Sequence, residues 1–110
     1  MKFEIYQSEK NQEFYFRLKA GNGQVILGSE GCKTKASALN GAESVRKNAQ
    51  DAAKFETKEA KNGKFHFNVK ATNGQVIGTS QLYTSESGMK NGIESVAKSS
   101  LDAEIVDLTA

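Results

Sequence analysis

Two residue types that often perform chemistry occur once each in this sequence, as His66 and Cys32. A histidine that shuttles protons needs a second positioned group, such as a carboxylate or a nucleophile, and no spacing supplies one for His66. A zinc site needs three or four Cys, His or carboxylate ligands, which one His and one Cys do not provide. We therefore expect no metal site, no cofactor and no catalytic residue.

Cys32 has one feature that favours reactivity, because a helix is expected to begin just after it, near Thr34. A helix N-terminus favours the thiolate, but a nucleophilic cysteine also wants a neighbouring histidine. The position 51 residues later holds Tyr83, so the pattern does not require a thiol there. Cysteine more often behaves as a small hydrophobic residue, and we interpret Cys32 in this way.

Two further patterns lack the spacing that chemistry requires. The serine-rich stretch Thr84–Gly88 has no G-x-S-x-G elbow. The Asn-Gly pairs lack the G-x-x-x-x-G-K-[ST] and G-x-G-x-x-G spacings that direct several amides at a phosphate. These patterns indicate a helix start and tight turns, and we predict that the protein is not an enzyme.

One polar strand face remains as a candidate binding surface. Residues 14–20 and 65–71 alternate between apolar and polar side chains, which indicates two strands that are each buried on one side. The polar positions are Tyr15, Arg17, Lys19, His66, Asn68 and Lys70. Aromatic rings among cations on a sheet are a means of binding single-stranded nucleic acid. The alternative is a solvated face, because a half-exposed sheet must present polar side chains.

An internal repeat accounts for the similarity of these two strands. Residues 14–52 and 65–103 align at a shift of 51 residues, with 18 identities in 39 positions. Upstream of them, Phe3-Glu4 corresponds to Phe55-Glu56, with a one-residue gap in the first turn. Such dense self-similarity indicates a tandem duplication.

Each half also contains hairpin turns and one helix. Asn-Gly follows each alternating strand and tolerates the positive φ of a tight turn. Apolar stripes with spacings of three and four residues then indicate a helix in each half. The stripes are Ala38, Ala42, Val45 and Ala49 in the first half and Met89, Ile93 and Val96 in the second. Thr34 is an expected N-cap, as is either Thr84 or Ser85. Gly41 and Gly92 indicate close approach of each helix to the sheet.

Three short segments at the start, the junction and the end share one alternating pattern. They are Phe3–Ile5, Phe55–Thr57 and Val106–Leu108. A strand after the second helix needs a partner, so we expect the terminal strands to be exchanged between the repeats. The predicted fold class is α+β, with two β-β-β-α units that form an antiparallel sheet and a helix from each repeat packed on one face. Residues 1–110 are expected to form one domain from repeats 1–53 and 54–110.

The strings Asn-Gly-Gln-Val-Ile and Asn-Gly-x-Glu-Ser-Val resemble those of the bacterial YegP-like proteins, in their duplicated branch. The resemblance covers nearly the whole chain, twice. It implies β3-α repeats that assemble a single antiparallel sheet with exchanged strands, and single-repeat members pair as dimers. The family has no known function, so the resemblance implies neither an activity nor functional residues.

Composition limits the remaining classes. The net charge is +2, and the first 54 residues carry +3 while the remainder carries −1, so neither half provides a strong field for a phosphate backbone. No run approaches the ~20 apolar residues of a membrane span. The first ten residues lack the apolar region of a secretion signal, and the single cysteine fits a reducing compartment, so we expect a cytoplasmic protein. We expect a monomer, because duplication supplies the second unit.

The expected function is a small non-enzymatic binding or protein-interaction module of unknown ligand. The alternative is a weak nucleic-acid binder that uses the basic face of the sheet. A partner is therefore expected to be a protein rather than a nucleic acid, and no membrane association is expected.

Overall fold

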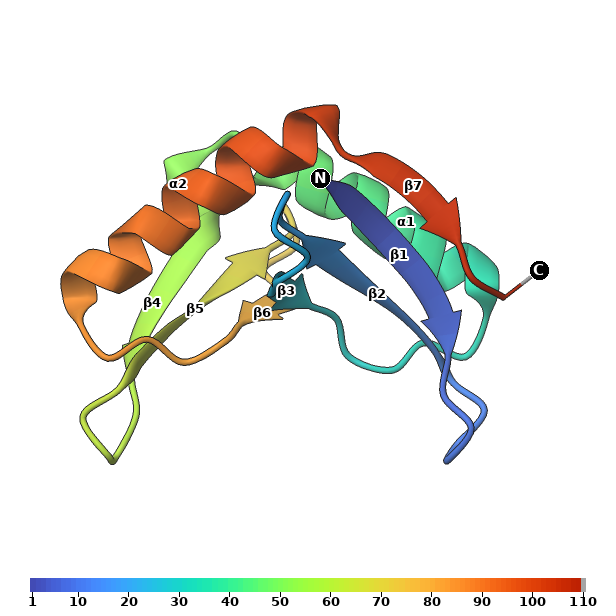
Figure 1. The fold of residues 1–110 in the computed structure, drawn as a ribbon, viewed down its shortest axis with the longest axis horizontal. Coiled ribbons are helices and arrows are strands. Elements are labelled where there is room, and N and C mark those ends of the chain that lie inside the picture. Colours follow the sequence, from blue (N-terminus) through green and yellow to red (C-terminus); the bar gives the residue numbers. More distant parts are fainter. Residues whose placement is uncertain (110) are drawn as a thin grey trace.

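The alternating and helical patterns form the expected elements in the computed structural model, which describes residues 1–109 (Figure 1). The strands are β1 (Lys2–Gln7), β2 (Phe14–Lys19), β3 (Val25–Gly28), β4 (Phe55–Glu59), β5 (Phe65–Lys70), β6 (Val76–Ser80) and β7 (Glu104–Asp107). The helices are α1 (Lys35–Asn48), the short 3-10 helix η1 (Ala52–Lys54) and α2 (Glu86–Asp102). The predicted α+β fold with two β-β-β-α units is confirmed.

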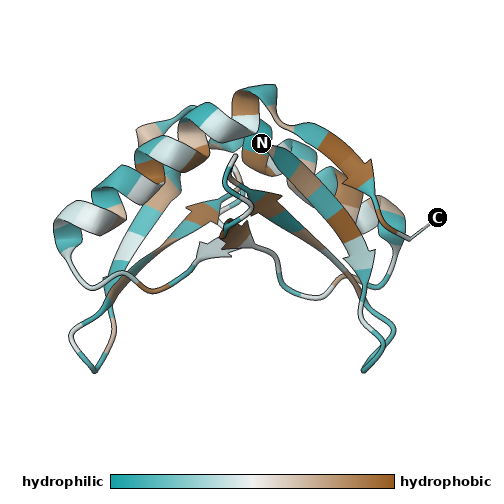
Figure 2. Ribbon diagram, viewed as in Figure 1, coloured by the Kyte–Doolittle hydropathy of each residue, from teal (hydrophilic) through white to brown (hydrophobic). Residues whose placement is uncertain are grey.

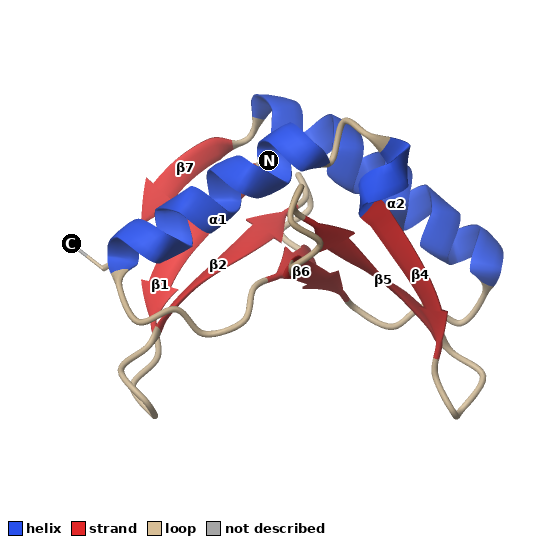
Figure 3. Cartoon of the chain, turned by 180° about the vertical axis from the view of Figure 1, so that it is seen from behind, coloured by secondary structure: helices blue, strands red, loops and turns tan. Residues whose placement is uncertain are grey.

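The described strands form one sheet in the order β4-β5-β6-β3-β2-β1-β7. The two repeats meet at the centre, where β3 and β6 pair antiparallel through Leu27 with Ser80 and Gly28 with Thr79. Figure 1 shows the β1–β2 and β4–β5 hairpins diverging like the legs of an arch, with both helices along its upper side. The view from behind in Figure 3 shows the same arrangement. Both helices therefore cover one face of the sheet, as predicted.

One strand pair departs from the antiparallel expectation. β7 runs parallel to β1, with Phe3 opposite Ile105 and Ile5 opposite Asp107. A hairpin connects strands that run antiparallel, whereas a connection through a helix allows the two strands to run parallel. β7 follows α2, so its connection allows the parallel pairing with β1. The exchange between repeats is carried by β7 alone, since β1 pairs with β2 of its own repeat.

The core lies between the sheet and the two helices, and its aromatic residues follow the repeat. The rings of Phe3 and Phe16 pack edge-on with their centroids 6.0 Å apart, and those of Phe55 and Phe67 pack edge-on with centroids 5.7 Å apart. A Cβ at Gly41 of α1 would lie 2.7 Å from Cε2 of Phe16, so this glycine permits the close approach that the sequence indicated. Figure 2 shows hydrophobic residues alternating along the strands and hydrophilic ones at the hairpin tips.

The caps and turns that bound these elements also follow the sequence. Thr34 and Ser85 are the N-caps, and their hydroxyls accept hydrogen bonds from the backbone N–H groups of Ser37 and Gly88. The turn after β2 has Gly23 at φ +85°, in the region that only glycine enters without strain. The turns therefore set the register that brings alternate side chains onto one face.

Candidate functional site

The six predicted binding residues lie on β2 and β5, at the positions that alternate with the core residues of these strands. In the first repeat the cations are directed to one carboxylate. Arg17 Nε donates to Glu4 Oε1 at 2.7 Å, and Lys19 Nζ lies 3.2 Å from the same oxygen. Lys2 Nζ lies 3.6 Å from Glu4 Oε2. Sequence reasoning missed Glu4, although its alternation with Phe3 and Ile5 places it on this face.

Glu4 is an unusual carboxylate, because only 6% of its side chain is exposed. Burial by itself raises the pKa of Glu4, but the hydrogen bonds and positive charges of Arg17 and Lys19 outweigh it and lower this pKa. Glu4 is therefore ionised at neutral pH and holds the cations around it. Charges engaged in this way are less available to a phosphate backbone.

The aromatic residues of the first repeat are also paired. Tyr15 stacks on Tyr6 of β1, with ring centroids 5.5 Å apart and an interplanar angle of 15°. The guanidinium of Arg17 lies 4.5 Å from the centre of the Tyr6 ring. Asn11 donates to the Tyr15 hydroxyl at 3.0 Å. The side chains of Tyr15 and Arg17 are thus held in a preformed cluster.

The second repeat builds a smaller cluster around Glu56 of β4. Lys70 Nζ lies 2.7 Å from Glu56 Oε2, and Asn68 Nδ2 donates to Oε1 at 3.2 Å. These hydrogen bonds, with the nearby charge of Lys58, lower the pKa of Glu56. His66 is half-buried, and its Nδ1 atom is buried without a hydrogen-bond partner among the described residues. The six predicted residues therefore lie in two groups of three, on β2 and on β5, which are separated by β3 and β6.

Cys32 lies beside a cavity of about 200 Å³ in the first repeat. The lining includes Phe16, Gly41 and Ile77. Burial raises the pKa of the Cys32 thiol, and the charges of Glu13 and Glu30 raise it further. A raised pKa opposes thiolate formation, so these surroundings favour the interpretation of Cys32 as a packing residue.

In the second repeat, Tyr83 takes the place of Cys32 and fills the corresponding space. Its ring stacks on Phe67 at 6.2 Å and lies against Gly92. Cys32→Tyr should place a ring over Gly41 in the same way. We expect the free energy of unfolding to rise by about 1 kcal/mol, measured by urea denaturation.

Cys32→Ala is the control for this change, because it removes the thiol and leaves the cavity open. It should not raise the free energy of unfolding. Destabilisation by Cys32→Tyr would mean that Phe16 does not make room for the ring.

The two repeats differ in what lies beside their first strands, β1 and β4. In the first repeat, β7 covers the edge of β1, and the Leu108 N–H donates to the Ile5 carbonyl at 2.8 Å. Among residues 1–109, no strand pairs with the outer edge of β4, the counterpart of β1. The repeat indicated this difference. Each copy has its own first strand, β1 or β4, but the chain has only one additional strand, β7, to lie beside them.

The pairing of β5 shows which backbone groups of β4 face outward. The Phe67 N–H donates to Ser80 Oγ at 2.9 Å, so it points toward β6 and away from Thr57, its partner on β4. The N–H and C=O of Thr57 therefore point away from β5. Phe16 makes the matching bond to Ser29 Oγ in the first repeat, where its partner Ile5 directs its carbonyl to β7.

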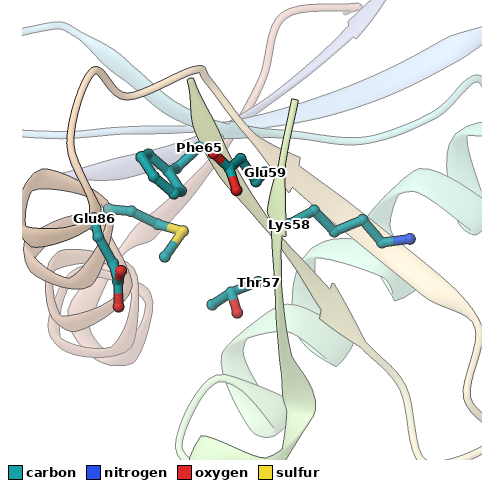
Figure 4. Close-up of a pocket in the computed structure, with 6 residues that line it drawn as sticks. Thr57, Lys58, Glu59, Phe65 and Glu86 are labelled. Atoms are coloured by element: carbon teal, nitrogen blue, oxygen red, sulfur yellow. The ribbon is translucent and has the colours of Figure 1, made fainter. Parts of the chain in front are cut away.

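A cavity of about 190 Å³ lies beside this open edge, between β4, Phe65 and the first turn of α2. It is lined by Thr57, Lys58, Glu59, Phe65, Glu86 and Met89. Figure 4 shows the Lys58 side chain extending away from the Glu86 side of this space. The walls of the cavity thus combine two carboxylates with the apolar side chains of Phe65 and Met89.

Two kinds of site are not found within residues 1–109. The described part of the chain contains no group of three or more His, Cys, Asp or Glu side chains placed to hold a metal ion. No helix in that part of the chain is long and apolar enough to cross a membrane.

The fold and its open edge define a duplicated α+β domain with one exchanged strand. The domain of unknown function DUF1508 matches this chain twice, over residues 9–56 and 60–107, and the protein belongs to that family. It is 56% identical over 106 residues to a UPF0339 protein encoded 5′ of the ptx operon in Stutzerimonas stutzeri, covering 96% of this chain and 95% of that protein. It is 46% identical over 107 residues to the UPF0339 protein YegP of Escherichia coli K12, covering 97% and 96%.

Two solved structures have the same fold. The solution NMR structure of a UPF0339 protein from Shewanella oneidensis matches with a TM-score of 0.92 at 47% identity, over 98% of this chain and 91% of that one. The solution NMR structure of E. coli yegP, a protein of unknown function, matches with a TM-score of 0.92 at 43% identity, over 99% and 93%. These relatives are uncharacterised, so they assign no function to the sites described above.

Proposed function

We propose that this protein is a non-enzymatic protein-interaction module whose binding site is the outer edge of β4. One observation carries the proposal: the equivalent edge of β1 is covered by an exchanged strand, while no described strand covers β4. Addition of an extended segment to an open sheet edge is a common mode of peptide recognition. The backbone of the segment forms the ladder, and side-chain pockets provide the selectivity.

The surroundings of β4 support a selective edge. Glu56, Lys58 and Glu59 place charges along this short strand, and such charges discourage indiscriminate pairing between edges. The outward N–H and C=O of Thr57 offer hydrogen bonds to a segment in the position that β7 occupies beside β1. The cavity beside Thr57 offers space for one side chain of that segment.

We further propose that residues 1–110 act as one cooperative domain, as a monomer and in the cytoplasm. Duplication supports the monomer, because both repeats already share one sheet. A free, half-buried Cys32 is in keeping with a reducing compartment. A stable dimer at micromolar concentration in a sedimentation experiment would contradict the monomer.

The basic sheet face is the second candidate site. Five cations share Glu4 and Glu56 there, which leaves an excess of positive charge beside the stacked pair of Tyr6 and Tyr15. The predicted set of Tyr15, Arg17, Lys19, His66, Asn68 and Lys70 would form the contact surface with single-stranded nucleic acid. The engagement of the cations with two carboxylates makes this the weaker candidate.

The edge is tested by Thr57→Pro. Proline removes the outward N–H of residue 57 and leaves the β4–β5 ladder intact, since that N–H takes no part in it. Affinity capture from the native cytoplasm, read by mass spectrometry, should recover proteins with the wild-type chain and lose them with Thr57→Pro.

Thr57→Val is the matched control, because it keeps the N–H and the β-branched shape, and it should retain the captured proteins. Circular dichroism of both variants establishes that they fold. Equal capture by Thr57→Pro would contradict the edge as the site. If the captured proteins are lost on nuclease treatment but are still captured by Thr57→Pro, the basic face would be favoured instead.

A further inference from the structure

The covered edge of the first repeat serves as a template for the open one. β7 lies parallel to β1, and Ile105, opposite Phe3, packs against the hydrophobic core. Two residues later, Asp107 lies opposite Ile5 and turns toward the start of α1. There Lys35 Nζ lies 2.8 Å from Asp107 Oδ2. The covering strand is thus held by its backbone, one apolar side chain and one ion pair with the first turn of a helix.

The second repeat has the same arrangement of first strand and helix start, but the charge at the first helical residue is reversed. Phe55 and Thr57 of β4 correspond to Phe3 and Ile5 of β1. On the helix, Glu86 stands at the position of Lys35, since both follow the N-cap directly. A residue placed opposite Thr57 would therefore meet a carboxylate where Asp107 meets an ammonium group.

This change of sign opposes occupation of the edge by β7 of a second copy. Such a strand would bring Asp107 against Glu86, and like charges in close contact repel. The neighbouring carboxylate of Glu59 adds to the repulsion. The site is therefore complementary to a strand with a basic residue at this place, which β7 does not have.

The cavity fits the chemistry of a lysine or arginine side chain. Phe65 and Met89 supply apolar walls for the carbon stem, while Glu59 and Glu86 supply charge for the head group (Figure 4). Lys90 lies 3.5 Å from Glu86, but both side chains are well exposed, and such pairs contribute little. A cation from a bound strand has two carboxylates available.

We propose that the β4 edge binds an extended segment of a partner protein parallel to β4, with an apolar residue opposite Phe55 and a lysine or arginine two residues later, opposite Thr57. This inference rests on the proposed function, because it specifies the ligand of the same edge. The apolar residue takes the role of Ile105, and the basic residue lies between Glu59 and Glu86.

Two labelled peptides test the selection by charge. The first has the sequence of residues 103–109, Ala-Glu-Ile-Val-Asp-Leu-Thr, and the second has lysine in place of Asp107. Fluorescence anisotropy with the full chain should show the lysine peptide bound at least about fivefold more tightly. Glu86→Lys should reverse the preference, because it restores the sign of the Lys35–Asp107 pair.

Glu94→Lys is the matched control, since Glu94 is an exposed residue of α2 outside the cavity lining and the change alters the net charge equally. It should keep the preference for the lysine peptide. A preference that Glu86→Lys does not reverse would overturn the inference. If neither peptide binds up to millimolar concentration, the inference fails, while capture sensitive to Thr57→Pro would still support the proposed function.

Orientation is tested with a spin label at the C-terminus of the lysine peptide. Parallel binding places that end near Glu59, so NMR line broadening should be stronger for the amide of Glu59 than for that of Phe55. The reverse order would overturn the parallel arrangement. A dimer of the wild-type chain that Thr57→Pro abolishes would place a second copy at the edge and would likewise overturn the inference.

Discussion

Glu4→Gln is expected to lower the free energy of unfolding by about 2 kcal/mol, because it removes charge-assisted hydrogen bonds and leaves clustered cations beside a neutral amide. Arg17 and Lys19 contact the buried carboxylate directly, and Lys2 lies close to it. The amide restores neither the charge nor the second acceptor oxygen. Urea denaturation at neutral pH, followed by circular dichroism, measures the change.

Glu56→Gln is the natural control, because Glu56 is the counterpart of Glu4 in the second repeat. Its side chain is 34% exposed, so solvent screens the lost charge, and the loss of stability should be clearly smaller. Equal losses for the two substitutions would show that burial of Glu4 does not set the size of the effect.

The same carboxylate makes stability depend on pH. The pKa of Glu4 is lowered from 4.5 in the folded protein, so its contribution is complete above that value and is lost as the pH falls through the lowered pKa. The stability difference between the wild type and Glu4→Gln should therefore shrink as the pH falls below about 4.5.

Removal of β7, in a chain that ends at Ala103, is expected to lower the free energy of unfolding by about 4 kcal/mol. The truncation loses the apolar contacts of Ile105 and the hydrogen bond from the Leu108 N–H to the Ile5 carbonyl. It also uncovers one edge of β1, which carries Phe3 and Ile5, two fully buried side chains. Urea denaturation with a probe in each repeat measures both the loss and its cooperativity.

A single transition reported by both probes would support one domain made of interdependent repeats. Two separate transitions would contradict that proposal. If the truncated chain does not fold, Ile105→Ala keeps the backbone ladder and should cost about 2 kcal/mol, since the side chain is partly buried against the core.

Local patterns predicted the elements because they depend on neighbours along the chain. Alternation defined the strands, Asn-Gly defined the turns, and the N-cap hydroxyl of Thr34 marked the start of α1. The same alternation placed Arg17 and Lys19 on the polar face. It did not reveal that they converge on Glu4, because that pairing depends on the register between β1 and β2.

The direction of β7 could not be predicted from its residues. Alternating side chains look the same whether a strand runs up or down, so Ile105 would face the core in either direction. Direction follows from the path of α2 across the sheet. The open edge of β4 could have been predicted from the repeat. The strand after the first helix serves as the first strand of the second copy, so only the strand after the second helix is left to cover an edge.

The single exchanged strand has a consequence for assembly. Two separate repeats, each with its own tail strand, would be related by a two-fold axis and would have the same tail strand at both edges of the sheet. In the joined chain, the segment after α1 has to serve as β4, so it is not available as a tail. Linkage thus turns a symmetric object into an asymmetric one, with β4 at one edge of the sheet and β7 at the other. The two edges of the sheet are therefore not equivalent, and a partner that recognises β4 would meet its site once in each molecule.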